Sequence, residues 1–202
     1  MRKNNILISG GGSGGHIFPA LAIADKINEK NKNSKIIFVG ARGKMEMKKV
    51  PKHGYKIIPI LICGFQRKNF FKNLFLPVKI IISLISSLFI VIKYKPVLVI
   101  GTGGYASGPL LFISSILNIP SLIQEQNSFP GVTNRILSKF VDKICVAYEN
   151  MDKFFPKSKI ILTGNPIRSL VFKNHNQEKA KSYFNLSQSN FTVLSIGGSL
   201  GA

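Results

Sequence analysis

The feature that most constrains this chain is a short apolar run that ends directly in glycines. Residues 5–9 read NILIS, and the sequence SGGGSGGHIFPALA follows from Ser9 to Ala22. Apolar residues then recur with the spacing of a helix, at Ala20, Leu21, Ile23, Ala24 and Ile27. Glycines permit the tight turn that such a strand-to-helix passage needs. A second apolar run, KIIFVG at residues 35–40, completes a β-α-β unit, whose two strands must be parallel.

Similar apolar runs repeat along the chain up to about residue 165. They occur at Val97–Ile100, Ser121–Ile123, Lys143–Ala147 and Lys159–Leu162. These runs are rich in β-branched residues and do not alternate with polar residues, as expected for a sheet that helices cover on both faces. We therefore predict an α/β fold: a doubly wound, parallel-sheet, Rossmann-like domain over residues 1–165.

The last 37 residues have a different composition. Residues 166–190 are polar and read as a linker with a weak helical pattern around Lys179–Phe184. Phe191–Ile196, FTVLSI, predicts a new buried strand, and GGSLGA follows it up to Ala202. A strand and glycine turn without a helix have nothing to pack on, so we expect residues 191–202 to be the truncated start of a second Rossmann-like domain.

Composition limits the class of protein. With 45% hydrophobic residues among 202, the chain can bury a core, which excludes a disordered tail.

Cys63 and Cys145 lie far apart in apolar stretches, and we expect buried, reduced thiols rather than a disulfide or a zinc site. The N-terminus has no secretory signature, which predicts a protein that stays in the cytoplasm.

The net charge of +20 predicts attraction to a polyanion, either nucleic acid or an anionic membrane. Residues 65–79 mix phenylalanines with lysines and an arginine, which favours an interfacial membrane patch. Residues 80–92 carry no charge, but as a helix they would be about 20 Å long, too short to span a bilayer. We expect them to form an ordinary buried helix of the α/β layer. No aromatic signature of RNA binding is visible, so no nucleic-acid partner is expected.

Two glycine-rich turns predict binding of phosphate. The first follows residues 5–9, and the second is GTGGYASGP at Gly101–Pro109. Both open at the carboxyl edge of the sheet, where backbone N–H groups and helix N-termini attract anions. Two phosphate sites, or one diphosphate held from both sides, would fit this arrangement.

The first turn also has the G-x-G-x-x-G spacing of dinucleotide-binding enzymes, at Gly10, Gly12 and Gly15. The second strand, however, ends in Gly40-Ala41-Arg42 without the acidic residue that binds NAD. Arg42 leaves open an NADP-dependent oxidoreductase. No Walker lysine follows the glycines.

His16 directly follows the glycines of the first turn. An imidazole there suits a general base that takes a proton from an attacking hydroxyl, and the alternative is a histidine that only hydrogen-bonds the turn. His53 and His175 lie in polar surroundings and are expected at the surface.

Three further motifs carry polar groups. Gln124–Asn127, QEQN, suits sugar hydroxyls or is an ordinary polar loop. Arg168, in GNPIR, can hold a phosphate bidentately, and Ser199, in GGSLGA, can face a diphosphate.

In this order, GGSGGHIFPALA, GTGGYASGP, EQN, GNPIR and GGSLGA resemble the N-terminal part of the MurG family of peptidoglycan glycosyltransferases, over essentially the whole chain. The resemblance implies a GT-B fold and metal-free, inverting transfer of N-acetylglucosamine. The donor would be UDP-N-acetylglucosamine, and the acceptor would be lipid I, undecaprenyl-pyrophosphoryl-MurNAc-pentapeptide, which becomes lipid II. No cofactor is implied, and the enzyme would be peripheral on the cytoplasmic face of the inner membrane.

The resemblance also assigns site residues. His16 matches the base that deprotonates the C4 hydroxyl of the muramyl sugar, and the turns at Ser13–Gly15 and Gly103–Gly104 match loops that hold the acceptor diphosphate. Asn127, Arg168 and Ser199 match donor contacts, with Arg168 stabilising the departing UDP. The substrate-binding set is Ser13, Gly14, Gly15, Gly103, Gly104, Tyr105, Glu125, Asn127, Arg168 and Ser199.

This sequence departs from the family pattern in having Ser13 for threonine and Leu200 for glutamine. We expect this chain alone to be inactive because the C-terminal half of the enzyme would be missing. The alternative is a non-catalytic, membrane-docking acceptor-binding subunit of a split glycosyltransferase.

Overall fold

The structure, a computed structural model, describes residues 4–64, 74–168 and 176–195. It divides into two compact units, residues 1–167 and residues 168–202, which are described separately.

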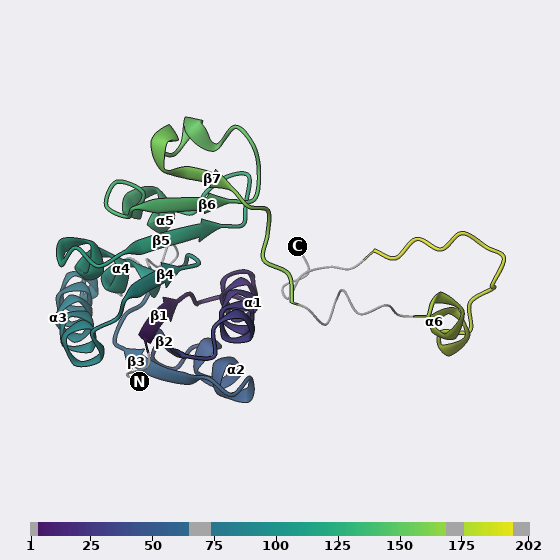
Figure 1. Cartoon of the computed structure of the whole chain (residues 1–202), viewed down its shortest axis with the longest axis horizontal. Coiled ribbons are helices and arrows are strands. Elements are labelled where there is room, and N and C mark those ends of the chain that lie inside the picture. Colours follow the sequence, from purple (N-terminus) through teal and green to yellow (C-terminus); the bar gives the residue numbers. More distant parts are fainter. Residues whose placement is uncertain (1–3, 65–73, 169–175, 196–202) are drawn as a thin grey trace. The chain divides into compact units, whose positions relative to one another are not determined.

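The first unit is built on a parallel sheet of seven strands in the order β3-β2-β1-β4-β5-β6-β7 (Figure 1). The strands are β1 (Asn4–Ser9), β2 (Ser34–Ala41), β3 (Lys56–Ile60), β4 (Leu98–Gly101), β5 (Ser121–Glu125), β6 (Lys143–Val146) and β7 (Ile160–Leu162). Every neighbouring pair is parallel. The predicted parallel α/β fold is confirmed.

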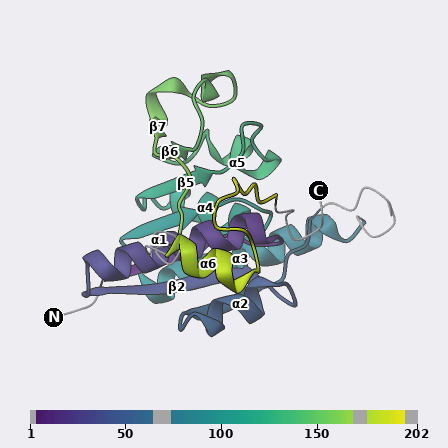
Figure 2. The same cartoon turned by 90° about the vertical axis from the view of Figure 1, so that its right-hand side faces the viewer.

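Helices cover both faces of this sheet. They are α1 (Gly14–Lys30), α2 (Glu46–Lys52), α3 (Leu76–Tyr94), α4 (Ser107–Ile116) and α5 (Val132–Leu137), with two 3₁₀ turns, η2 (Met151–Lys153) and η3 (Lys157–Lys159). Figure 1 shows α1 and α2 on one face and α3 and α4 on the other, and Figure 2 looks onto the face with α1 and α2.

Each face of the sheet has its own core. Because successive side chains of a strand point to opposite faces, Ile6 and Ile8 pack with Leu21 of α1, whereas Leu7 packs with Leu110 of α4. These side chains are at most 7% exposed. Burial on both faces of the sheet therefore explains why apolar and polar residues do not alternate along these strands.

The strand order reverses between β1 and β4. From β1 the chain adds β2 and β3 on one side, then crosses to β4 on the other side of β1. The loops that follow β1 and β4 therefore start from adjacent strands and lead to helices on opposite faces of the sheet. Ligands of open α/β sheets bind in the crevice between two such loops.

Two elements of the first half gave no sequence signal. Helix α2 is only seven residues long with Pro51 inside it, and β3, KIIPI, contains Pro59. Pro59 is tolerated because β3 is an edge strand that pairs only with β2.

Helix α3 is longer than the uncharged stretch that the sequence indicated. It runs over 19 residues, with a mean hydropathy of 2.1, so by length and composition alone it is long enough to cross a membrane. At about 1.5 Å per residue the whole helix is roughly 28 Å long, whereas its uncharged stretch at residues 80–92 is about 20 Å.

The expectation of an ordinary buried helix is wrong for the outer face of α3. Only Ser83, Ser87, Ile90 and Val91 are buried within the domain. Large apolar side chains at helical spacing face solvent on the other side: Val78, Ile81, Ile85, Phe89 and Ile92, each at least 50% exposed. We call these five residues the α3 outer face. Most of the expected membrane patch at residues 65–79 lies outside the described residues.

The second unit contains α6 (Gln177–Tyr183), close to the predicted helix. The Asn176 side chain caps it by accepting a hydrogen bond from the Lys179 N–H. The buried strand expected from Phe191 is wrong over residues 191–195, which form no strand and leave Phe191 94% exposed. A strand requires a neighbour for its backbone groups, and the described residues of this unit contain no other strand.

Cys63 and Cys145 are free thiols that are partly rather than fully buried. Burial raises the pKa of the Cys145 thiol.

Ile123 lies in the centre of the sheet and is completely buried, whereas Ile161 lies on edge strand β7 and is 43% exposed. We expect Ile123→Ala to lower the free energy of unfolding by about 2–5 kcal/mol because it removes buried contacts and leaves a cavity. The matched variant Ile161→Ala should lose only about 1 kcal/mol or less. Urea titrations followed by circular dichroism measure both, and equal losses would contradict this placement of the core.

Candidate functional site

The first glycine turn leads from β1 into α1. Ser13 is the N-cap residue, but its side chain makes no capping hydrogen bond. In the described part of the chain, the N–H groups of Gly14 and Gly15 donate to no protein acceptor, while those of His16 and Ile17 donate to the Ser13 carbonyl. The start of this 17-residue helix therefore presents unpaired N–H groups and positive potential to an anion.

The second glycine turn, after β4, packs directly against the first. Gly103 and Gly104 have φ values of +95° and +77°, the left-handed region that favours glycine. The Gly11 N–H donates to the Gly103 carbonyl at 3.4 Å. A Cβ atom at Gly104 would lie 2.1 Å from the Gly11 carbonyl oxygen. Only glycine allows this approach of one backbone to the other.

Thr102 connects the two turns. Its Oγ1 donates to the His16 carbonyl at 2.7 Å, and its N–H donates to the Ser9 carbonyl at 2.9 Å. The first turn also needs a glycine at residue 10, since a Cβ there would lie 1.8 Å from Thr102 Oγ1. Thr102 thus fixes the start of α1 against the end of β4.

His16 lies where the two turns meet. Its Nδ1 is 2.9 Å from the Thr102 carbonyl oxygen and 3.3 Å from Oε1 of Gln126, in the loop after β5. Its ring lies against the second turn, because a Cβ at Gly103 would be 2.8 Å from Nδ1 and one at Gly104 would be 3.2 Å from Cδ2. The structure thus brings together three motifs that are distant in the sequence.

Glu46, at the start of α2, is a structural residue beside the site that the sequence did not reveal. Its side chain is completely buried. Oε2 accepts a hydrogen bond from the Gly12 N–H at 3.1 Å, and Oε1 accepts one from the Ala41 N–H at 3.0 Å. A carboxylate thus ties the first glycine turn to the end of β2. The only signal in the sequence was an acid shortly after the second strand.

This carboxylate also bears on the dinucleotide alternative. The Gly12 N–H, which a G-x-G-x-x-G turn would offer to a pyrophosphate, is already bonded to Glu46. A negative charge at that point repels a second anion. The N-terminus of α1 is therefore the better anion site, and the geometry does not favour an NADP-dependent oxidoreductase.

Tyr105 follows the second turn and packs on the first. A Cβ at Gly12 would lie 3.1 Å from its Cε1, and one at Gly64 would lie 2.9 Å from Cδ1. Burial, then the charges of Glu46 and Cys63, raise the pKa of the Tyr105 phenol. Its hydroxyl is thus a neutral donor at physiological pH.

Glu125, expected to contact substrate, is used inside its own loop. It is 1% exposed. One oxygen accepts from the N–H and Nδ2 of Asn127, both at 3.0 Å, and the other accepts from the Gly131 N–H at 3.1 Å and Asn134 Nδ2 at 2.9 Å. Since the carboxylate is buried and accepts four hydrogen bonds, we assign it to ordering the loop instead. Asn127 itself is exposed.

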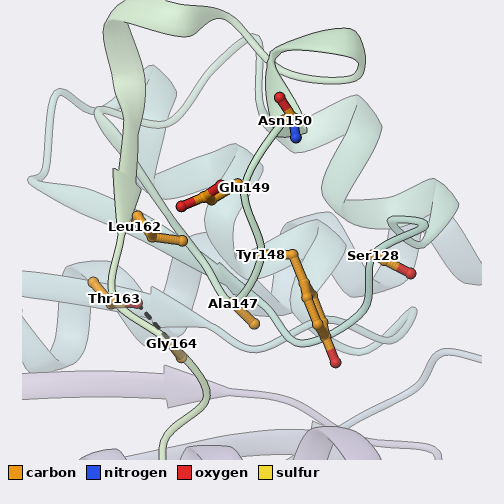
Figure 3. Close-up of a pocket in the computed structure, with 8 residues that line it drawn as sticks. All are labelled: Ser128, Ala147, Tyr148, Glu149, Asn150, Leu162, Thr163 and Gly164. Atoms are coloured by element: carbon orange, nitrogen blue, oxygen red, sulfur yellow. Dashed lines mark hydrogen bonds between the residues drawn. The ribbon is translucent and has the colours of Figure 1, made fainter.

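A hollow that the sequence did not indicate lies at the carboxyl ends of β6 and β7 (Figure 3). Its volume is about 740 Å³. It is lined by Ser128, Ala147, Tyr148, Glu149, Asn150, Leu162, Thr163 and Gly164. In Figure 3, Glu149 points toward Leu162, whereas Tyr148 extends away from it.

The remaining predicted residues are not placed at this site. Arg168 is partly buried and belongs to the second unit, and Ser199 lies outside the described residues. Within the residues that the structure describes, no group of three or more metal-ligating side chains occurs.

Comparison with known proteins gives concordant findings. The profile of the glycosyltransferase family 28 N-terminal domain matches residues 6–146. A curated relative from Flavobacterium psychrophilum is 52% identical over 203 residues, which is 100% of this chain and 55% of the relative. One from Christiangramia forsetii is 53% identical over 198 residues, which is 98% of this chain and 54% of the relative. Both are named UDP-N-acetylglucosamine--N-acetylmuramyl-(pentapeptide) pyrophosphoryl-undecaprenol N-acetylglucosamine transferase.

Among solved structures, the crystal structure of Acinetobacter baumannii MurG matches with a TM-score of 0.69 at 30% identity, covering 82% of this chain and 47% of that one. A glycosyltransferase from Rickettsia africae matches in fold, with a TM-score of 0.63 at 14% identity, covering 94% of this chain and 51% of that one. The expected Rossmann-like domain of a GT-B glycosyltransferase is confirmed. The chain spans about half the length of the curated relatives it matches.

Gly54 provides a matched control for the contact between the two turns. It has a φ of +80°, like Gly104, but a Cβ there would meet no atom within 4 Å. We expect Gly54→Ala to lower the free energy of unfolding by about 1–2 kcal/mol, the cost of a left-handed non-glycine residue. Gly104→Ala adds the clash with the Gly11 carbonyl and should lose a further 1–3 kcal/mol or so. Urea titrations measure the difference, and equal losses would mean that the turns are not packed as described.

Proposed function

We propose, from the premise that this chain belongs to glycosyltransferase family 28 through its N-terminal domain, that it supplies the acceptor half of an inverting glycosyltransferase. The reaction would move N-acetylglucosamine from UDP-N-acetylglucosamine to the C4 hydroxyl of the muramyl sugar of lipid I, giving lipid II. The names of the curated relatives support these substrates. The observation that carries the proposal is the His16 imidazole at the junction of two glycine turns.

His16 is the proposed general base. Because Nδ1 faces the Thr102 carbonyl oxygen, Nε2 is the nitrogen with a lone pair for the acceptor hydroxyl. As the C4 oxygen forms its bond to the anomeric carbon, its proton passes to Nε2. The bond from the anomeric carbon to the diphosphate breaks on the opposite side, and UDP leaves with the electron pair.

The two turns are the proposed site for the acceptor diphosphate. The N–H groups of Gly14 and Gly15, the Ser13 hydroxyl and the α1 dipole are suited to a doubly charged group. We propose Asn127, Arg168 and Ser199 as donor contacts, with Arg168 balancing charge on the departing UDP. No metal ion is required by this scheme.

The α3 outer face is the proposed membrane contact, in keeping with a lipid-linked acceptor. Five apolar side chains line one side of α3, and Lys79 and Lys93 flank the stretch between them. Apolar side chains in the acyl boundary and cations near headgroup phosphates would hold the domain peripherally on the cytoplasmic face of the inner membrane.

His16→Ala tests the base. We would introduce it into a fusion of this chain with the C-terminal half of the Flavobacterium psychrophilum relative and follow transfer of radiolabelled N-acetylglucosamine to a lipid I analogue. We expect kcat to fall about 10²- to 10⁴-fold, as for loss of a general base, with little change in the donor KM. His53→Ala, at an exposed histidine, should leave kcat unchanged. A near-normal kcat for His16→Ala would rule out the assigned role.

Substitutions on the α3 outer face test membrane contact. We expect the triple variant Ile81→Ser, Ile85→Ser, Phe89→Ser to lose most of its co-sedimentation with anionic vesicles at high salt, where the +20 charge is screened. The control variant Tyr183→Ser, Phe184→Ser removes side chains that are 80% and 68% exposed on α6 and should bind like the unmodified chain. If the triple variant binds equally well, α3 does not contact the membrane.

A further inference from the structure

We propose that Gln126 is a positioning residue that holds the His16 imidazole in its Nδ1–H form, so that Nε2 alone accepts the proton. This inference rests on the proposed role of His16 as base. From the sequence, Gln126 was only one member of a polar loop that suits sugar hydroxyls.

Three oxygen atoms fix the orientation of the Gln126 amide. Its Nε2 lies 2.8 Å from the Thr102 carbonyl oxygen, 2.5 Å from Oε1 of Gln124 and 3.4 Å from the Gln124 carbonyl oxygen. The amide nitrogen can donate to these acceptors, whereas a reversed amide would place its own oxygen against all three. The NH₂ group must therefore face this cluster.

The orientation of the amide in turn fixes the proton on His16. With its nitrogen toward the three oxygens, Gln126 turns Oε1 toward Nδ1 of His16, at 3.3 Å. The Thr102 carbonyl oxygen is also an acceptor, at 2.9 Å from the same nitrogen. Since neither oxygen can donate, Nδ1 carries a proton in both the neutral and the charged imidazole. Every proton that His16 gains or loses is then gained or lost at Nε2.

Hydrogen bonds of Gln124 and Asn165 hold Gln126 in place. Gln124 is only 2% exposed, and its Nε2 donates to Oδ1 of Asn165 at 3.4 Å. Nδ2 of Asn165 donates to the Gln126 carbonyl at 3.2 Å. A side-chain network thus runs from the segment after β7, through the end of β5, to the imidazole.

The partners of His16 are neutral. Among the described residues, no carboxylate bonds to His16: Glu125 is occupied by its loop, and Glu46 is bonded to Gly12 and Ala41. Tyr105, another titratable group next to the turns, is a neutral phenol whose ring packs on Gly12. A carboxylate behind the imidazole would orient it equally well but would repel a diphosphate on the adjacent turns. Two amide-type oxygens orient the ring without adding negative charge.

The test is the tautomer of His16, measured on this chain by long-range ¹⁵N–¹H correlation of ¹⁵N-labelled protein above the titration range of histidine. We expect a single Nδ1–H form for the unmodified chain, assigned by loss of the signal in His16→Gln. In Gln126→Met, which fills the space but leaves only the Thr102 carbonyl of the two acceptors that face Nδ1, we expect the preference for Nδ1–H to weaken and a second population with the proton on Nε2 to appear. His53, whose Nδ1 lies 3.0 Å from the Lys49 carbonyl, is the internal reference and should not change.

A shorter amide separates the reach of the acceptor from the chemistry of the side chain. Gln126→Asn keeps the amide but is one methylene shorter, so its oxygen should not reach Nδ1 and the mixture should appear. In the fusion enzyme we expect Gln126→Met to lower kcat about three- to tenfold, the worth of one hydrogen bond, at unchanged donor KM. An Nε2–H form in the unmodified chain, or one unchanged tautomer in both Gln126→Met and Gln126→Asn, would overturn the proposal. These outcomes do not depend on the His16→Ala assay, which tests the proposed function separately.

Discussion

The close packing of one backbone turn on another is the constraint on which this site depends. The strand order reverses between β1 and β4, so the turns that follow these strands leave the sheet side by side. They can meet only because Gly104 has no side chain to strike the Gly11 carbonyl. That approach places His16, the first residue after the glycines of one turn, against the backbone of the other. The position of the imidazole thus follows from topology and from missing Cβ atoms.

The distribution of charge around the turns follows a similar logic. The chain has only eight acidic residues, yet two of them, Glu46 and Glu125, are buried beside the glycine turns. Both carboxylates are bonded to backbone N–H groups and order loops, which compensates for their burial. Among the described residues, the N–H groups of Gly14 and Gly15 at the start of α1 have no protein acceptor. The same elements therefore fix the shape of the loops and leave one end of α1 available to an anion.

The sequence predicted those parts of the site that depend on neighbouring residues within one short motif. An apolar run followed by glycines needs a strand and a turn, and parallel strands bring such turns to one edge, so His16 and Gly103–Gly104 could be named in advance. The roles of Glu46 and Gln126 could not, because each depends on which backbone groups lie across the fold. At Phe191 the composition favoured a strand, but residues 191–195 form none, and the described residues of the second unit offer no other strand for pairing.

Helix α3 reverses the usual amphipathic pattern. Small serines, Ser83 and Ser87, face the domain, where they allow close packing, while large apolar side chains face outward. Residues 62–64 join this helix to the turns: Lys79 Nζ of α3 lies 3.7 Å from Cys63 Sγ, and the next residue, Gly64, packs on the Tyr105 ring. Cys63 and Gly64 thus lie between the first turns of α3 and the Tyr105 ring. Under the proposed function, the site for the acceptor diphosphate and the membrane contact on α3 would therefore belong to the same domain.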